Sequence, residues 1–486
     1  MTSSTVLIVG AGPTGLTLAC TLARSGAAVR IIDKSPSFHR TSRAKGPNQR
    51  SREIFADLGV GEALDAAGST RMVLRKYRGG VALHDADINA GPPPGPGVPY
   101  PTGLGIPQWK VEEILREKLA SYGVRVELGC ELAGLAQDRE GVLVTLADGR
   151  RIEAGYAVGC DGGHSPVRKA LGVGFEGSSG PEEVMWCGDV EADGLDRGYW
   201  HQWFDEDGAM LLWPIPGTTS WQLQSSLERD EAGRPMAPSM AGFQRLFDRH
   251  ARVPGVRLAN PTWLSTYRVS VRMAERFREG RVFLAGDAAH VQPIAGGLGM
   301  NTGIQDAFNL GWKLALVARG EAGEALLDTY DEERRPVAAW TLKLTGERLR
   351  AALEGTRTAG VGTEVVLTED TTTLGVGYGW SSLAWGGRGA GERAPDGTGA
   401  DGRLFGLFAG PHFTLLGFGA GSAPALAEVA GRFPELVRAH RADGAGAAYG
   451  VEGEGLVLVR PDHHIALSTG ADRGAEVVDR LRHLGR

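Results

Sequence analysis

Three glycines near the N-terminus have the spacing of a phosphate-binding turn. Gly10, Gly12 and Gly15 form the pattern GxGxxG directly after the apolar run of residues 5–10. The first glycine makes a tight turn, the second lets the backbone approach a pyrophosphate, and the third lets a helix pack closely on the strand. Asp33 stands where a carboxylate can accept a hydrogen bond from a ribose hydroxyl. The sequence therefore predicts a dinucleotide site, and the alternative is a glycine-rich turn that binds nothing.

A second polar, glycine-rich segment follows the apolar run of residues 281–285. Asp287 stands at the C-terminal end of that predicted strand, where open α/β sheets bind ligands. We expect its carboxylate to bind a sugar-alcohol hydroxyl, and the alternative is a cap on the next helix. Three glycines then leave a loop before a helix without side chains. Such a loop can lie against a flat ring, and the N-terminus of the helix would point at that ring. These glycines are Gly296, Gly297 and Gly299.

Two segments resemble motifs of a known enzyme family. Residues 160–168 (CDGGHSPVR) resemble the DGxxSxxR motif of class A flavoprotein monooxygenases, and residues 281–290 (RVFLAGDAAH) resemble their GD motif. Together with the GxGxxG turn, the motifs stand in the order of that family and cover roughly residues 1–350. The chain thus resembles aromatic hydroxylases with the fold of para-hydroxybenzoate hydroxylase.

The resemblance implies one long FAD site built from all three motifs. Arg43 would approach the pyrophosphate, although a surface salt bridge is the alternative. Gln108 opens the family pattern QxxxExxL before a predicted helix, and Leu132 or Ala133 would offer its backbone to adenine. The residues that the resemblance assigns to FAD are Gly12, Pro13, Thr14, Gly15, Asp33, Lys34, Arg43, Gln108, Leu132, Asp161, Gly286, Asp287, Pro293, Gly297, Gly299, Met300 and Asn301.

The resemblance also implies the reaction. NADPH or NADH reduces FAD, O2 adds at flavin C4a, and the hydroperoxide delivers one oxygen atom to an electron-rich ring. Because the flavin performs the difficult steps, no nucleophile–base pair is expected. The nearest group to a catalytic residue is Pro293, whose carbonyl in the family faces substrate and flavin. His290 is expected to be packed and hydrogen-bonded rather than to act as a base. NAD(P)H is expected to bind transiently, since the sequence has no second fingerprint.

Three other readings of the function remain open at this point. The same scaffold could catalyse Baeyer–Villiger oxygen insertion or epoxidation, because those reactions differ only in the pose of the substrate. A flavin-binding protein that holds a ligand without converting it belongs to a different class. A simple NAD dehydrogenase is the third reading.

The elements around these motifs predict an α/β chain of three domains. Residues 1–172 and 275–385 would form a Rossmann-like FAD-binding domain that carries long helices. Residues 173–274 alternate in polarity and are rich in aromatic side chains, which predicts an inserted antiparallel-sheet substrate domain with a contribution from residues 75–105. Residues 386–486 resemble a thioredoxin-like domain, without CxxC, that begins with a glycine-rich linker.

The inserted sheet is expected to form the far wall of the substrate pocket. Flat apolar side chains there suit a polycyclic substrate, although about half of them could instead face a core behind the sheet. The candidates are Trp203, Met210, Trp213 and Trp221, with Gly296 on the loop. Residues 456–462 (LVLVRPD) resemble the phenol-hydroxylase and aromatic-polyketide-hydroxylase branch. That likeness favours a polycyclic polyketide as the substrate.

Composition limits the partners and the compartment. The formal charge is −6, which argues against binding to nucleic acid or to an anionic membrane. The four cysteines form no CxxC pair, so we expect neither a metal site nor a disulfide framework. No signal peptide or apolar run of membrane-spanning length is found, which predicts a soluble cytoplasmic protein. We expect a monomer or homodimer. His463 and His464 lie in a late turn and are expected to be solvated.

Overall fold

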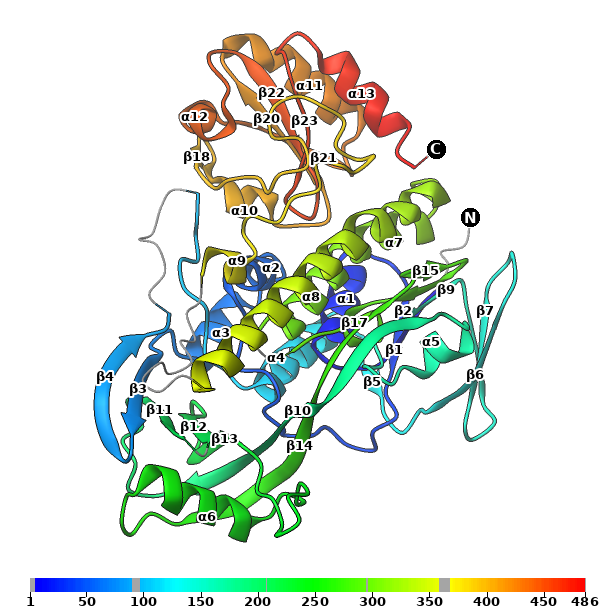
Figure 1. Cartoon of the computed structure of the whole chain (residues 1–486). Coiled ribbons are helices and arrows are strands. Elements are labelled where there is room, and N and C mark those ends of the chain that lie inside the picture. Colours follow the sequence, from blue (N-terminus) through cyan, green and yellow to red (C-terminus); the bar gives the residue numbers. More distant parts are fainter. Residues whose placement is uncertain (1–4, 90–96, 207, 294–295, 358–367, 486) are drawn as a thin grey trace.

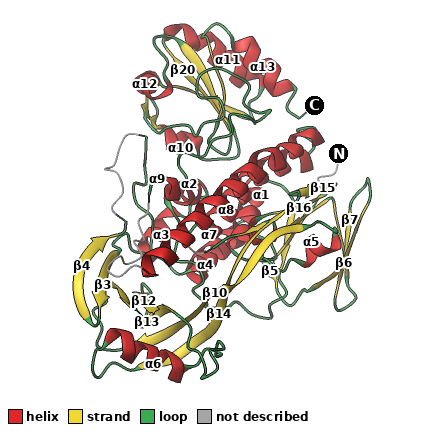
Figure 2. Cartoon of the chain, viewed as in Figure 1, coloured by secondary structure: helices red, strands yellow, loops and turns green. Residues whose placement is uncertain are grey.

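The computed structural model describes residues 5–89, 97–206, 208–293, 296–357 and 368–485. Figure 1 shows the C-terminal segment at one end of the molecule and the sheet that carries α6 at the other. In Figure 2 the helices α1, α7 and α8 gather between these two regions. Within the described residues, no helix is both long and apolar enough to cross a membrane.

A six-stranded sheet forms the nucleotide-binding half and has the order β15-β16-β9-β1-β2-β5. All neighbouring pairs are parallel except β15 with β16. Strand β1 is buried at every position, as the apolar run predicts for a parallel strand covered on both faces. The strands are β1 (Val6–Val9), β2 (Val29–Ile32), β5 (Val126–Glu127), β9 (Tyr156–Gly159), β15 (Arg278–Glu279) and β16 (Val282–Leu284).

Four long helices accompany this sheet. Helix α1 begins with Pro13, whose fixed φ and missing N–H suit the first turn of a helix, and it connects β1 to β2. Helix α7 is buried along almost its whole length and packs against α1. The helices are α1 (Pro13–Arg24), α4 (Gln108–Ser121), α7 (Gly299–Ala318) and α8 (Asp328–Arg357). A separate three-stranded sheet consists of β6 (Leu132–Gln137), β7 (Val142–Leu146) and β8 (Arg151–Ala154).

An eight-stranded sheet has the order β17-β14-β10-β13-β12-β11-β3-β4. Its pairs are antiparallel except β11 with β3. Helix α6 (Met240–Ala251) covers one face and shares a core with it, while the other face is turned toward the FAD-binding half. The strands are β3 (Val73–Arg78), β4 (Val81–Asp87), β10 (Phe175–Ala192), β11 (Trp200–Asp205), β12 (Gly208–Pro214), β13 (Ser220–Ser225), β14 (Leu258–Ala274) and β17 (His290–Val291).

The C-terminal segment has a four-stranded sheet of order β21-β20-β22-β23. One pair is parallel and two are antiparallel. This topology is compatible with the thioredoxin-like expectation, which remains a prediction. The elements are β20 (Phe413–Phe418), β21 (Val437–Arg441), β22 (Gly455–Val459), β23 (Ile465–Thr469), α11 (Ala423–Arg432) and α13 (Gly474–Arg482).

Short elements complete the described chain. They are α2 (Gln49–Asp57), α3 (Gly61–Ala67), α5 (Pro166–Ala170), α9 (Glu369–Thr372), α10 (Leu404–Phe408), α12 (Gly446–Tyr449), β18 (Thr398–Gly399), β19 (Gly402–Arg403), and the 3-10 helices η1 (Gly286–Ala288), η2 (Glu324–Leu327), η3 (Ala420–Ser422) and η4 (Asp443–Ala445).

The glycine-rich segment after residue 385 is packed rather than free, so the expectation of a linker is wrong. Gly386 bridges to Leu467, and Arg393 bridges to His464. A Cβ on Gly387 would overlap the Ser468 carbonyl. The glycines therefore permit close backbone contact with β23.

The expectation of solvated histidines in the late turn is also wrong. His463 and His464 are buried, because the turn is inserted against α2, α7 and α8. His463 Nε2 lies 2.9 Å from Asp57 Oδ2 on α2. Arg460 at the start of the turn donates to Glu333 Oε1 on α8 at 2.6 Å.

Candidate functional site

The glycine turn and the DG motif are in direct backbone contact. Gly10 has φ +106°, and a Cβ on it would overlap the carbonyl of Cys160. A Cβ on Gly15 would overlap the carbonyl of Gly10. The first and third glycines thus have the roles expected of a tight turn and of close helix–strand packing.

Thr14 is the point where α1, η1 and α7 meet. A Cβ on Gly286 would lie 2.6 Å from Thr14 Oγ1. A Cβ on Gly303 of α7 would overlap the same oxygen. These glycines bring the N-terminus of α1 and the first turns of α7 to one location, as the expected single site requires.

Arg168 ties the DG motif to the GD motif. Its guanidinium is buried and donates to the Ala288 carbonyl at 2.7 Å and to the Gly163 carbonyl at 2.8 Å. Hydrogen bonds from a charged donor are among the stronger ones in proteins. Arg168 is therefore a positioning residue for both loops.

The surface along these motifs fits an extended cofactor that carries phosphate and sugar groups. Nothing lies within 4 Å of a Cβ built on Gly12, Gly297 or Gly299, so backbone faces open space at all three. Asp161 Oδ1 is buried and has no hydrogen-bond partner among the described residues. Asp33 accepts from the amides of Ala11 and Ser35, both at 2.8 Å, which fixes its carboxylate at the end of β2. An orphaned oxygen and a side-chain-free cradle are what FAD would use.

Asp287 is free to bind a ligand hydroxyl. Its carboxylate makes no hydrogen bond within the described residues, and the N-cap position of α7 is Leu298 instead. Asp287 is accessible to solvent, although protein atoms surround it on most sides. This burial raises the pKa of Asp287, and the charges of His290 and Arg43 oppose the rise.

Asn301 joins two loops at the start of α7. Its Oδ1 accepts from the Asn48 amide at 2.8 Å, and its Nδ2 donates to the Gly297 carbonyl at 2.8 Å and to the Gly46 carbonyl at 3.4 Å. Met300 beside it is half-buried against the core. The two loops that would flank a flat ring are thus held at a fixed separation.

The loop of residues 293–297, which the resemblance places beside the flavin, is only partly described. Pro293 is buried and Gly296 has φ +93°, whereas Ile294 and Ala295 lie outside the described residues. The role of the Pro293 carbonyl stays a prediction.

The remaining expected cofactor residues lie around the same surface or beside it. Gln108 begins α4 and donates to Glu112 Oε1 at 2.8 Å. Arg43 is exposed and makes no ion pair within the described chain, so the salt-bridge alternative finds no support. Leu132 is buried at the start of β6, and Lys34 is exposed after Asp33. Their contacts with FAD stay predictions.

A buried ionic cluster behind the site was not foreseen from the sequence. Asp306 Oδ2 accepts from the Gly286 amide at 3.0 Å and from His290 Nε2 at 2.7 Å, and its Oδ1 accepts from Arg334 Nε at 2.7 Å. Burial opposes ionisation of Asp306, but the Arg334 and His290 charges outweigh it and lower its pKa to about 2. His290 is thus packed and hydrogen-bonded, as expected. Asp306 stands in the stretch after the GD motif, but spacing alone could not reveal its partners.

Three of the four expected pocket side chains face away from the site. Trp203, Met210 and Trp221 are buried in the core between the sheet and α6. For example, Trp203 meets Phe247 of α6 edge to face at 5.6 Å. The expectation that these three side chains line the pocket is therefore wrong. Side chains alternate between the two faces of a strand, and these three lie on the face covered by α6.

The opposite face of the sheet carries Trp213 together with a polar row. Register pairs Trp213 with Gln222 and Gln222 with Asp189. The neighbouring row pairs Gln202 with Leu211 and Leu211 with Gln224. Asp189 Oδ2 accepts from the Ser42 amide at 3.0 Å, so this face is the one turned toward the FAD-binding half.

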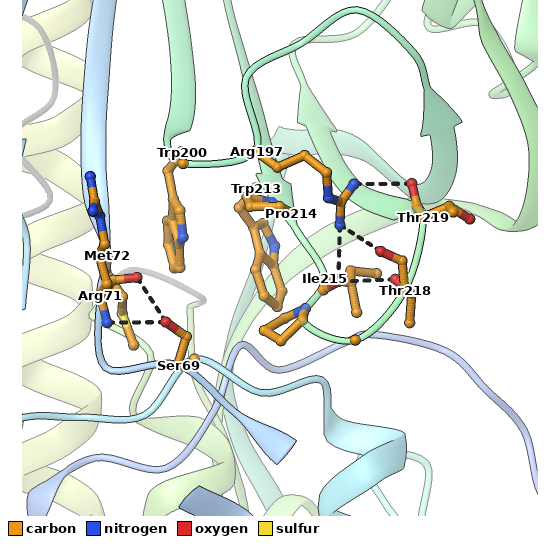
Figure 3. A pocket seen from close by; sticks show the side chains of 14 residues that line it. Ser69, Arg71, Met72, Arg197, Trp200, Trp213, Pro214, Ile215, Thr218 and Thr219 are labelled. Atoms are coloured by element: carbon orange, nitrogen blue, oxygen red, sulfur yellow. Dashed lines mark hydrogen bonds between the residues drawn. The ribbon is translucent and has the colours of Figure 1, made fainter. Parts of the chain in front are cut away.

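A cavity of about 580 Å³ opens at the edge of that face. Figure 3 shows the Trp200 and Trp213 side chains next to each other, with their ring centroids 5.2 Å apart. Arg197 holds the far wall by donating to backbone carbonyls of the turn 215–220. The near wall includes Gly105, which directly precedes Ile106, and the Ile106 amide donates to the Lys45 carbonyl. The cavity therefore adjoins the loop that Asn301 holds.

Comparisons with known proteins agree with this geometry. A family model described as FAD binding domain matches residues 3–345. A flavin-dependent monooxygenase from Mycobacteroides abscessus is 41% identical over 491 residues, which cover 96% of this chain and 98% of the relative. A rifampicin monooxygenase from Streptomyces venezuelae is 39% identical over 352 residues, 71% of each chain. A crystal structure of aklavinone-11 hydroxylase with FAD and aklavinone has a TM-score of 0.85 and 30% identity, and it covers 99% of both chains.

These findings confirm FAD as the cofactor, with NAD(P)H and O2 as the usual co-substrates. They also exclude the simple dehydrogenase, since the relative matched over nearly its full length is a monooxygenase. The chain belongs to the FAD-binding-domain family and is an FAD-dependent monooxygenase of the class A aromatic-hydroxylase type.

Proposed function

We propose that this monooxygenase hydroxylates a polycyclic aromatic substrate of the polyketide type. The cavity beside Trp200 and Trp213 carries the proposal, because its volume and two adjacent indole rings suit fused rings. One similar structure is an aklavinone-11 hydroxylase bound to aklavinone, and one similar sequence is a rifampicin monooxygenase. Both of these compounds are large.

When bound, FAD supplies hydride acceptance from NAD(P)H and activation of O2. The protein's part is to hold and orient. The N-terminus of α1 and Gly12 would face the pyrophosphate, Asp33 a ribose hydroxyl, and Asp287 the ribityl chain. Gly297 and Asn301 would bound the flavin ring, and Pro293 would face both flavin and substrate. The sheet would exclude water from the opposite side.

The test is a panel of polycyclic compounds that includes aklavinone and rifampicin. Purified protein with FAD and NADPH would be incubated under ¹⁸O2, and the products analysed by mass spectrometry. Gain of one labelled oxygen on an intact ring system, located by NMR, supports hydroxylation. A product of the same mass with the oxygen inserted into the ring would show Baeyer–Villiger oxidation instead of hydroxylation. An epoxide of that mass would show epoxidation.

Flavin bleaching separates the enzyme from a mere binder. A substrate of a hydroxylase is expected to accelerate bleaching by NADPH at least tenfold. Equal bleaching rates with and without every ligand, together with release of H2O2 alone, would refute the proposed function.

A further inference from the structure

Lys45 spans the gap between the cofactor loop and the substrate sheet. Its own carbonyl accepts from the Ile106 amide at 2.9 Å, and Asn301 holds the carbonyl of the next residue, Gly46. The backbone of Lys45 is therefore fixed next to the loop that would border the flavin. Its side chain reaches across to the sheet, where Nζ lies 3.4 Å from Gln224 Oε1 on β13 and 5.3 Å from the centre of the Trp200 ring on β11.

The ammonium has no ionic partner in the described parts of the chain. Its two neighbours, the Gln224 amide and the Trp200 indole, are both neutral. Burial lowers the pKa of Lys45 to about 8, and no nearby charge offsets that effect. At pH 7 the protonated Lys45 side chain is therefore favoured over the neutral amine by roughly ten to one.

Three other charged residues stand on the segments around Lys45, and none of them is recognised as its ion-pair partner among the described residues. Asp189 on β10 accepts from the Ser42 amide through Oδ2, while its buried Oδ1 has no hydrogen-bond partner among the described residues. It stands opposite Gln222, one row away from Gln224. Lys76 on β3 stands opposite Gln202 and has partners of its own. Arg43, two residues before Lys45, is exposed.

Lys45 is partly buried, and a partly desolvated cation normally has an anion beside it, because desolvation of an unpaired charge is costly. Here the described part of the chain supplies an aromatic wall and a hydrogen-bond acceptor but no paired carboxylate. Trp200 also lines the 580 Å³ cavity, so the cavity and the Lys45 ammonium share this indole ring as a neighbour. A ligand is therefore the remaining source of negative charge.

We propose that Lys45 binds the ionised oxygen of an acidic hydroxyl group on the aromatic substrate and orients that ring toward the flavin. This inference rests on the proposed function and specifies its substrates as phenols or enols of fused-ring quinones. The hydroxyl proton passes to solvent when Lys45 is already an ammonium, or to the Lys45 amine when it is neutral, so the step needs no oxidant or reductant. The retained anion makes the ring electron-rich and directs oxygen to a position ortho or para to the bound oxygen.

Alizarin, a dihydroxyanthraquinone, is a suitable probe because its absorption band moves to longer wavelength when a hydroxyl ionises. The FAD-loaded enzyme would be titrated with alizarin and with anthraquinone, which has no hydroxyl, between pH 5 and pH 9. Variants are Lys45→Met, Lys45→Arg and Gln224→Glu, which would give the ammonium a carboxylate of its own. Lys343→Met, on an exposed face of α8, is the matched control.

We expect the wild type to bind alizarin as its anion about one pH unit or more below the pH at which free alizarin ionises. Lys45→Met should remove that shift and weaken alizarin binding at least tenfold, while anthraquinone binding changes less than twofold. Lys45→Arg should keep most of the shift, Gln224→Glu should reduce it, and Lys343→Met should match the wild type. Binding of the alizarin anion should also decline as the pH rises above about 8, because free Lys45 then loses its proton.

Two results would overturn the inference in distinguishable ways. Tight binding of both anthraquinones, with no shift or with a shift that persists in Lys45→Met, would refute the role of Lys45 and leave the polycyclic function intact. Failure of the wild type to bind either ring system, although FAD stays bound and NADPH reduces it, would refute both proposals.

Discussion

Replacing Asp306 with Asn should test how the buried ionic cluster supports the cofactor site. The two carboxylate oxygens accept from three donors: the Gly286 amide, His290 and Arg334. An amide side chain has one acceptor oxygen, so at least one of these donors would face an NH2 group. The variant would also leave the Arg334 side chain, which is 0% exposed, without its counter-ion.

The expected loss of stability follows from that orphaned charge. Breaking a buried ion pair by removing one partner costs about 3–5 kcal/mol. Arg334 keeps hydrogen bonds to Tyr378 Oη at 2.9 Å and to the Thr302 carbonyl at 3.2 Å. The lower end, about 3 kcal/mol, is therefore expected. Loss of the hydrogen bond to Gly286, beside Asp287, should weaken FAD binding about tenfold, which corresponds to roughly 1.5 kcal/mol.

Urea unfolding followed by tryptophan fluorescence measures the first effect, and FAD titration of the apoprotein measures the second. Asp328→Asn is the matched control, because Asp328 pairs with Arg278 through a side chain that is 75% exposed. It should change stability by less than about 1 kcal/mol. If Asp306→Asn has no larger effect than this control, the cluster does not stabilise the site and the reasoning is wrong.

Three further predictions follow from single contacts. Asp287→Ala should weaken FAD retention with little change in the stability of the apoprotein, since the carboxylate has no partner among the described residues; full FAD occupancy after gel filtration would contradict its assignment. Gly303→Ala should cost about 1–3 kcal/mol of unfolding free energy, because the new Cβ would overlap Thr14 Oγ1, whereas Gly346→Ala on α8, with nothing within 4 Å, should be neutral or stabilising; equal effects in chemical denaturation would refute this packing argument. Burial lowers the pKa of His464 to about 4 against the pull of Asp462. As the pH falls from about 6.5 to about 4, His464 is therefore protonated in the unfolded chain but not in the folded one. The free energy of unfolding should decrease by about 3 kcal/mol over that range. A pH series of melting temperatures for His464→Gln should be flatter than that of the wild type, and parallel curves would show that another group titrates.

The sequence was most informative where chemistry restricts the backbone. Gly10 and Gly15 could be recognised because a tight turn and a close helix each demand glycine, whereas the role of Asp287 stays a prediction. The faces of the inserted sheet could not be assigned in the same way. Alternation separates Trp213 from Met210, but aromatic and apolar residues occur on both faces because α6 covers one and the FAD-binding half covers the other.

Residues whose roles depend on distant partners were beyond the sequence. The role proposed for Lys45 depends on its contacts with Gln224 and Trp200, which lie on two different strands far along the chain. Burial of His463 is accompanied by a contact with Asp57, which lies far away in the sequence. No local pattern encodes either pairing.

The turn at residues 460–464 makes the last hundred residues an internal part of the cofactor-binding half. Arg460 meets Glu333, Asp462 Oδ2 accepts from Asn309 of α7 at 3.2 Å, and Arg50 of α2 donates to the Asp462 carbonyl at 2.7 Å. Truncation before this turn would remove the Arg460 guanidinium from Glu333, leave Lys313 as its cationic partner, and uncover the carboxylate of Asp57. A chimaera that exchanges this terminal segment would therefore need matching substitutions in the three contacted helices, α2, α7 and α8.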